Sequence, residues 1–136
     1  MLLILIVPLQ VINVIRIENI YPDRSRVGAQ LGLHAKSLIP LSDTIILDDH
    51  DFPAFLYYSD RKEVFVATQQ GPKPEEWWIL RYQDLPAFIS VHPNTWVITP
   101  NIKNLPIEVQ SGQIINKFQG YNFLKFNSYG NLALQD

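Results

Sequence analysis

Four aspartates, Asp43, Asp48, Asp49 and Asp51, lie within nine residues of the chain, with His50 among them and no lysine or arginine between them. Like charges this close repel one another, and a bound cation relieves the repulsion because carboxylate oxygens are common ligands of divalent cations. Asp48 and Asp49 are therefore candidate metal ligands, with His50 as an extra ligand. A solvated turn after a strand explains the same residues, since aspartate side chains hydrogen-bond to nearby backbone groups there.

A second charged break follows, in which Asp60 lies two residues before Lys62. Two carboxylates that hold a magnesium ion, beside a lysine that stabilises developing charge, are the minimal core of metal-dependent nuclease chemistry. One candidate function is therefore a metal-dependent nuclease or phosphodiesterase that uses Asp48, Asp49, Asp60 and Lys62, with a divalent cation as its only cofactor. Such a short pattern often arises by chance. A charged hairpin tip that keeps a sheet edge soluble is the alternative.

Aromatic side chains provide a second kind of candidate site, made of Trp77, Trp78, Tyr82 and Trp96. Aromatic rings stack on unpaired bases and on other flat or apolar ligand faces. Adjacent residues of a strand point to opposite sides, so either Trp77 or Trp78 should face outward. An outward tryptophan favours a binding surface, for a protein, a carbohydrate or a single-stranded nucleic acid. A loop that covers the indole is the alternative.

Other catalytic patterns are missing from the sequence. It contains no glycine-framed serine, no P-loop, no dinucleotide fingerprint and no HExxH pattern. It also contains no cysteine, which excludes disulfides and thiolate nucleophiles. These absences favour a non-catalytic module, and we expect it to bind a protein partner within a larger assembly.

Size and charge limit the organisation of the chain. Its 136 residues are 47% hydrophobic and 18% charged, which predicts one domain, residues 1–136, with a substantial core. The net charge of −2 does not support nucleic-acid binding, which usually requires a basic stripe. The apolar run at residues 2–7 ends at Pro8 and lacks a positive flank, so we expect a buried strand there. We therefore predict a cytoplasmic protein with no membrane segment.

Short runs of β-branched and aromatic residues, separated by turn residues, predict short strands. The expected strands are 2–20 in one or two pieces, 44–47, 54–58, 63–67, 77–82, 87–91, 95–99, 107–110 paired with 113–116, and 121–126. Residues 26–39 alternate like a strand but contain helix formers, so both readings stay open.

These expectations together predict an all-β or β-rich α+β fold. We expect a sandwich or a partly open barrel of short antiparallel strands. At most one or two short helices are expected, in 25–38 or 74–82, because ten prolines oppose long ones.

Overall fold

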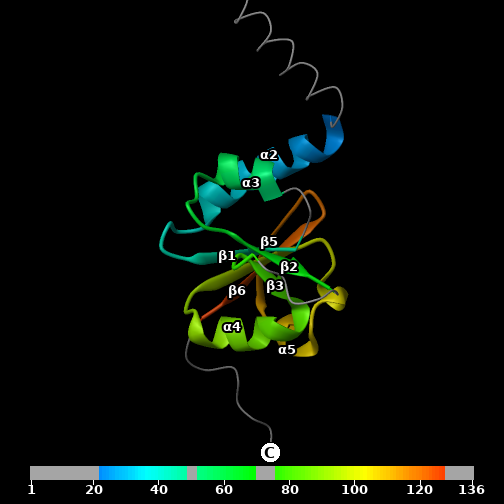
Figure 1. Ribbon diagram of the computed structural model, residues 1–136. Coiled ribbons are helices and arrows are strands. Elements are labelled where there is room, and N and C mark those ends of the chain that lie inside the picture. Colours follow the sequence, from blue (N-terminus) through cyan, green and yellow to red (C-terminus); the bar gives the residue numbers. More distant parts are fainter. Residues whose placement is uncertain (1–21, 49–51, 70–75, 128–136) are drawn as a thin grey trace, which may run out of the picture.

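The computed structural model describes residues 22–48, 52–69 and 76–127, and its elements form three layers (Figure 1). The strands predicted for residues 2–20, together with Asp49, His50 and Asp51, lie outside the described residues. The helices are α2 (Pro22–Leu38), α3 (Phe52–Ser59), α4 (Leu85–Val91) and α5 (Ile107–Gln110). The strands are β1 (Thr44–Leu47), β2 (Phe65–Thr68), β3 (Ile79–Arg81), β4 (Thr95–Thr99), β5 (Gln113–Phe118) and β6 (Tyr121–Phe126).

The six strands form one mixed sheet in the order β3-β2-β1-β4-β6-β5. Strands β3, β2, β1 and β4 run parallel, and β6 and β5 extend the sheet in antiparallel pairing. Strand β1 lies inside the sheet, with Ile46 opposite Phe65 of β2 on one side and Val97 of β4 on the other. A strand that is paired on both sides and covered on both faces is usually a continuous apolar run, and residues 45–47 of β1 are all apolar and buried.

Helices cover both faces of the sheet. In Figure 1, α2 and α3 lie above it and α4 and α5 lie below it. Successive strand residues alternate between the two cores. Ile45, Leu47 and Phe123 pack with the upper helices, whereas Ile46 and Leu124 pack with the lower ones. All five of these side chains are fully buried.

The two upper helices cross closely at Gly32. A Cβ atom at this position would lie 2.8 Å from the carbonyl oxygen of Phe55 and 2.9 Å from the backbone nitrogen of Ser59. Glycine is therefore required by the approach of the α3 backbone, and it fixes how α3 lies on α2. The salt bridge between Lys36 and Asp60, 3.0 Å long, joins the ends of the same two helices.

The direction of the chain across the sheet reverses at β1. From β1 the chain passes through α3 above the sheet to β2 and then to β3. From β3 it returns through α4 below the sheet to β4, on the other side of β1. The boundary between β1 and β4 is therefore the topological switch point of a doubly wound sheet.

The predicted all-β fold is wrong. Residues 54–58, 87–91 and 107–110, which the sequence predicts as strands, belong to helices α3, α4 and α5. Residues 26–38, for which the sequence leaves strand and helix both open, belong to helix α2. For α3 and α4 the physical reason is the parallel sheet, because parallel strands need crossover connections and a helix is the usual one. The predicted strands 44–47, 95–99 and 121–126 are confirmed.

The predicted hairpin at 107–116 is also wrong, because α5 occupies its first half. The actual hairpin joins β5 to β6 through Gln119 and Gly120, which both have positive φ, at 49° and 83°. Two central residues with positive φ are typical of the turn whose twist matches paired strands. Of the described helices, none is long and apolar enough to cross a membrane.

Candidate functional site

Asp48 and Thr99 meet at the switch point, where β1 and β4 end side by side. The hydroxyl of Thr99 donates a 2.6 Å hydrogen bond to one carboxylate oxygen of Asp48. The phenol of Tyr82, which follows β3, donates to the other oxygen. The carboxylate is thus held between two hydroxyl donors, one at the end of β4 and one directly after β3. Ligands of doubly wound sheets usually bind just outside this part of the sheet.

Further bonds fix Thr99 in place. Its hydroxyl accepts a hydrogen bond from the backbone N–H of Asn101 at 3.1 Å, and its carbonyl accepts one from the Asn122 amide at 3.3 Å. The pKa of Tyr82 is raised, chiefly by burial and also by the hydrogen bond to Asp48. The phenol therefore keeps its proton near neutral pH and acts as a hydrogen-bond donor to Asp48.

A pocket of about 360 Å³ lies at the opposite, amino edge of the sheet. It is lined by residues 41–44, which precede β1, and by residues 60–63 and Phe65, which lead into β2. Arg61 is 9% exposed and donates to the carbonyl oxygens of Asp43 at 3.0 Å and Ile39 at 2.5 Å. Burial lowers the pKa of Arg61, and the nearby Asp43 opposes that shift. The guanidinium therefore ties the two pocket walls together.

Asp43 is the second buried charge beside this pocket. Its carboxylate accepts hydrogen bonds from the indole of Trp96 at 2.9 Å and from the Ser42 hydroxyl at 3.1 Å. The ammonium of Lys125 lies 3.9 Å from the carboxylate and 5.2 Å from the centre of the Trp96 ring. These contacts fix the carboxylate on one side of the pocket.

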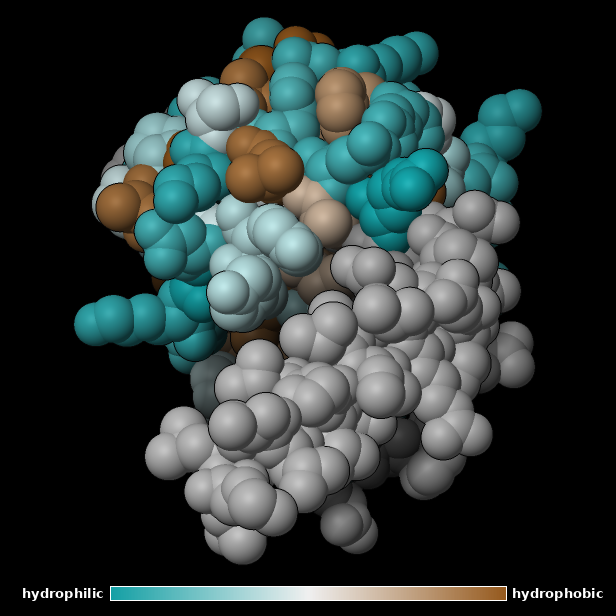
Figure 2. Space-filling view, turned by 90° about the horizontal axis from the view of Figure 1, so that it is seen from above, coloured by the Kyte–Doolittle hydropathy of each residue, from teal (hydrophilic) through white to brown (hydrophobic). Residues whose placement is uncertain are grey.

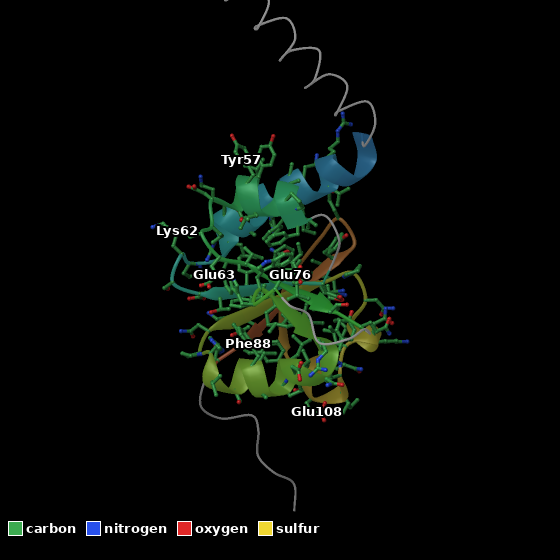
Figure 3. The ribbon with its side chains drawn as sticks, in the orientation of Figure 1. Tyr57, Lys62, Glu63, Glu76, Phe88 and Glu108 are labelled. Atoms are coloured by element: carbon green, nitrogen blue, oxygen red, sulfur yellow. The ribbon has the colours of Figure 1, made fainter. Side chains whose placement is uncertain are left out.

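An aromatic cluster continues from the pocket along the lower face. Phe65 lines the pocket, and its ring centre lies 5.9 Å from Trp77 and 4.7 Å from Phe88. Phe88 stacks on His92 with ring centres 3.8 Å apart. Trp77 is the most exposed member of the cluster, at 67%. The side chain of Phe88 lies in the lower layer, near α4 (Figure 3).

The four aromatic residues predicted as one binding surface do not lie on one surface. Trp77 is exposed, whereas Trp78 is half-buried and stacks on Phe52 with ring centres 4.9 Å apart. Trp96 is 3% exposed in the upper core, and Tyr82 packs against the lower core. Of this set, only Trp77 offers a largely exposed ring. The contribution of Phe65 was missed because its position beside the pocket depends on the parallel pairing of β1 and β2.

The predicted metal ligands are also separated. Asp48 lies at the carboxyl edge, bonded to Thr99 and Tyr82, whereas Asp60 follows α3 at the amino edge and pairs with Lys36. Asp49 lies outside the described residues. Within residues 22–48, 52–69 and 76–127, no three acidic or histidine side chains gather as a metal site would require. Asp48 and Asp60 therefore lie at opposite edges of the sheet and do not form the shared metal site that the nuclease hypothesis requires.

Comparisons with protein-family models, with curated proteins and with solved structures found no match to this chain.

Proposed function

We propose that this chain is a non-catalytic protein-interaction module, a subunit of a larger assembly, which presents the outer face of α2 and α3 to a protein partner. The observation that carries the proposal is the exposure of Tyr57. Its side chain is 80% exposed and packs edge-on against Tyr58, with ring centres 5.1 Å apart. Figure 3 shows Tyr57 pointing away from the sheet.

The composition of this face is typical of a protein contact surface. Leu33 on α2 is 55% exposed and Tyr58 is 43% exposed. In the coloured part of Figure 2, which views the molecule from above, the hydrophobic residues stand among hydrophilic ones. Tyrosine is enriched at protein interfaces because it combines a large apolar ring with a hydroxyl that hydrogen-bonds.

The support beneath these residues is rigid. Phe55 is fully buried under α3, and the close crossing at Gly32 fixes α3 on α2. A tyrosine on a rigid helix loses little conformational entropy on binding, which favours its use as an anchor.

The proposal is tested by a photo-crosslinking amino acid placed at Tyr57 in the cell that makes the protein. We expect one adduct of defined mass, which mass spectrometry identifies as a protein. The matched control carries the same amino acid at Glu108, an exposed position in the opposite layer (Figure 3). Equal labelling from both positions, or none from Tyr57, contradicts the proposal.

The identified partner then allows a quantitative check. Tyr57→Ala removes an exposed ring, so it should leave the free energy of unfolding within about 0.5 kcal/mol of the original value. The same change should weaken partner binding by about tenfold or more if Tyr57 is an anchor of the interface.

A further inference from the structure

We propose that the pocket at the amino edge of the sheet binds an uncharged carbohydrate ring. This site is distinct from the outer face of α2 and α3, and the proposal does not depend on the protein contact. The pocket, of about 360 Å³, lies within the range of roughly 300–1,000 Å³ that is usual for small-molecule sites.

The polar lining of the pocket suits hydroxyl groups. Asp60 and Glu63 provide carboxylate acceptors, and Lys62 provides an ammonium donor. A sugar hydroxyl both donates and accepts hydrogen bonds, so it is satisfied by a lining of mixed character. The side chains of Lys62 and Glu63 lie on the same side of the molecule, at one edge of the sheet (Figure 3).

The charge of the pocket is nearly balanced, which does not favour a polyanion. The lining carboxylates Asp43, Asp60 and Glu63 stand against the lining cations Arg61 and Lys62, and Lys125 and Lys36 pair with Asp43 and Asp60, so the formal sum is −3 + 4 = +1. Nucleic acids are bound mainly through several phosphates neutralised by lysine and arginine, whereas most cations here are already engaged by carboxylates or by backbone carbonyls. An uncharged ligand does not need such cations.

Aromatic rings provide an apolar side to the site. Phe65 lines the pocket, and the ring of the exposed Trp77 packs edge-on against the Phe65 ring. The face of an aromatic ring is negatively polarised and attracts positively polarised C–H groups. A sugar ring carries such C–H groups on one of its faces. The combination of hydroxyl-binding groups and aromatic rings therefore fits a carbohydrate better than a purely polar or a purely apolar ligand.

The walls of the pocket are held in place before any ligand arrives. Arg61 joins the segment before β1 to the segment before β2 through its bonds to Ile39 and Asp43. Lys36 holds Asp60 at 3.0 Å. A preformed site loses less free energy on binding because its side chains are already ordered.

The test is a titration of the full chain with a panel of neutral monosaccharides and disaccharides, followed by NMR chemical shifts and tryptophan emission. Free sugars are compared with the same units at the ends of immobilised oligosaccharides, which separates recognition of a free sugar from recognition of a glycan chain. We expect saturable binding of at least one member, with shifts at Lys62, Glu63, Phe65 and Trp77. An oligothymidylate serves as the polyanionic comparison and should not bind.

Two variants locate the binding. Glu63→Gln and Lys62→Gln alter exposed side chains, and each should weaken binding by about tenfold, as expected for loss of a hydrogen bond to a charged group. Glu108→Gln, the same chemical change on α5, should have no effect. The proposal is overturned if no sugar binds, if only the oligonucleotide binds, or if both pocket variants bind as tightly as the original chain.

Discussion

The hydroxyl of Thr99, at the end of β4, donates a 2.6 Å hydrogen bond to the carboxylate of Asp48, immediately after β1. This bond crosses the sheet at the point where the order of the strands reverses. Since Tyr82 donates to the second carboxylate oxygen, Asp48 connects β1, β4 and the turn after β3. The cluster thus joins the two halves of the doubly wound sheet.

Thr99→Val should destabilise the protein, because it removes a hydroxyl and leaves Asp48 with one donor fewer in a partly buried place. The side chain of Thr99 is fully buried. The expected loss of unfolding free energy is about 1–3 kcal/mol, as for an unsatisfied buried polar group. Urea denaturation measures it. Thr99→Ser keeps the hydroxyl and should recover most of the loss, and a Thr99→Val protein as stable as the original would show that the hydrogen bond to Asp48 contributes nothing.

Stability should fall at alkaline pH because of Tyr82. Its pKa is raised in the folded protein, so the folded state holds the phenolic proton more tightly than the unfolded state does. The stabilisation is fully present below about pH 10, the ordinary tyrosine pKa, and is lost as the pH rises toward the folded-state value. Denaturation at a series of pH values should show a smaller decline for Tyr82→Phe. The same decline in both proteins would exclude Tyr82 as its source.

Gly32→Ala should destabilise the protein, although alanine is the better helix former by about 1 kcal/mol. The added Cβ would lie 2.8 Å and 2.9 Å from backbone atoms of α3, which cannot rotate away. Overpacking of this kind costs about 1–3 kcal/mol, so α3 must shift. Thermal denaturation measures the change. Ser37→Ala, at an exposed site of the same helix, is the control and should be close to neutral; a stabilised Gly32→Ala protein would disprove the close crossing.

The strands that could be predicted from the sequence are those whose local residues agree with their surroundings. Thr44–Leu47 and Thr95–Thr99 are rich in β-branched residues and lie inside the sheet, so propensity and burial favour the same structure. Ile107–Gln110 has a similar composition but forms one helical turn after Pro106. Local residue types do not distinguish these two outcomes.

Helix α3 shows why the rest of the fold could not be predicted. Its sequence from Phe52 to Ser59 is aromatic and looks strand-like, yet Phe55 and Ser59 are buried at helical spacing. That spacing was hidden by exposed Tyr57 and Tyr58 beside it. The candidate sites depend on the same non-local information, since Asp48 meets Thr99 only when β1 and β4 pair in parallel.

Asp43 and Asp60 should differ sharply in their effect on stability, although both lie beside the same pocket. Asp43 is 9% exposed and accepts the indole N–H of the buried Trp96. Asp43→Ala leaves that donor unpaired and should lower the free energy of unfolding by about 1–3 kcal/mol. Asp60 lies in an exposed salt bridge with Lys36, so Asp60→Ala should cost less than about 1 kcal/mol. Urea denaturation of both variants tests the difference. Added salt should reduce the Asp60 effect more than the Asp43 effect, because exposed ion pairs are screened and buried hydrogen bonds much less so. An Asp43→Ala cost no larger than about 1 kcal/mol would contradict a stabilising role for the bond to Trp96.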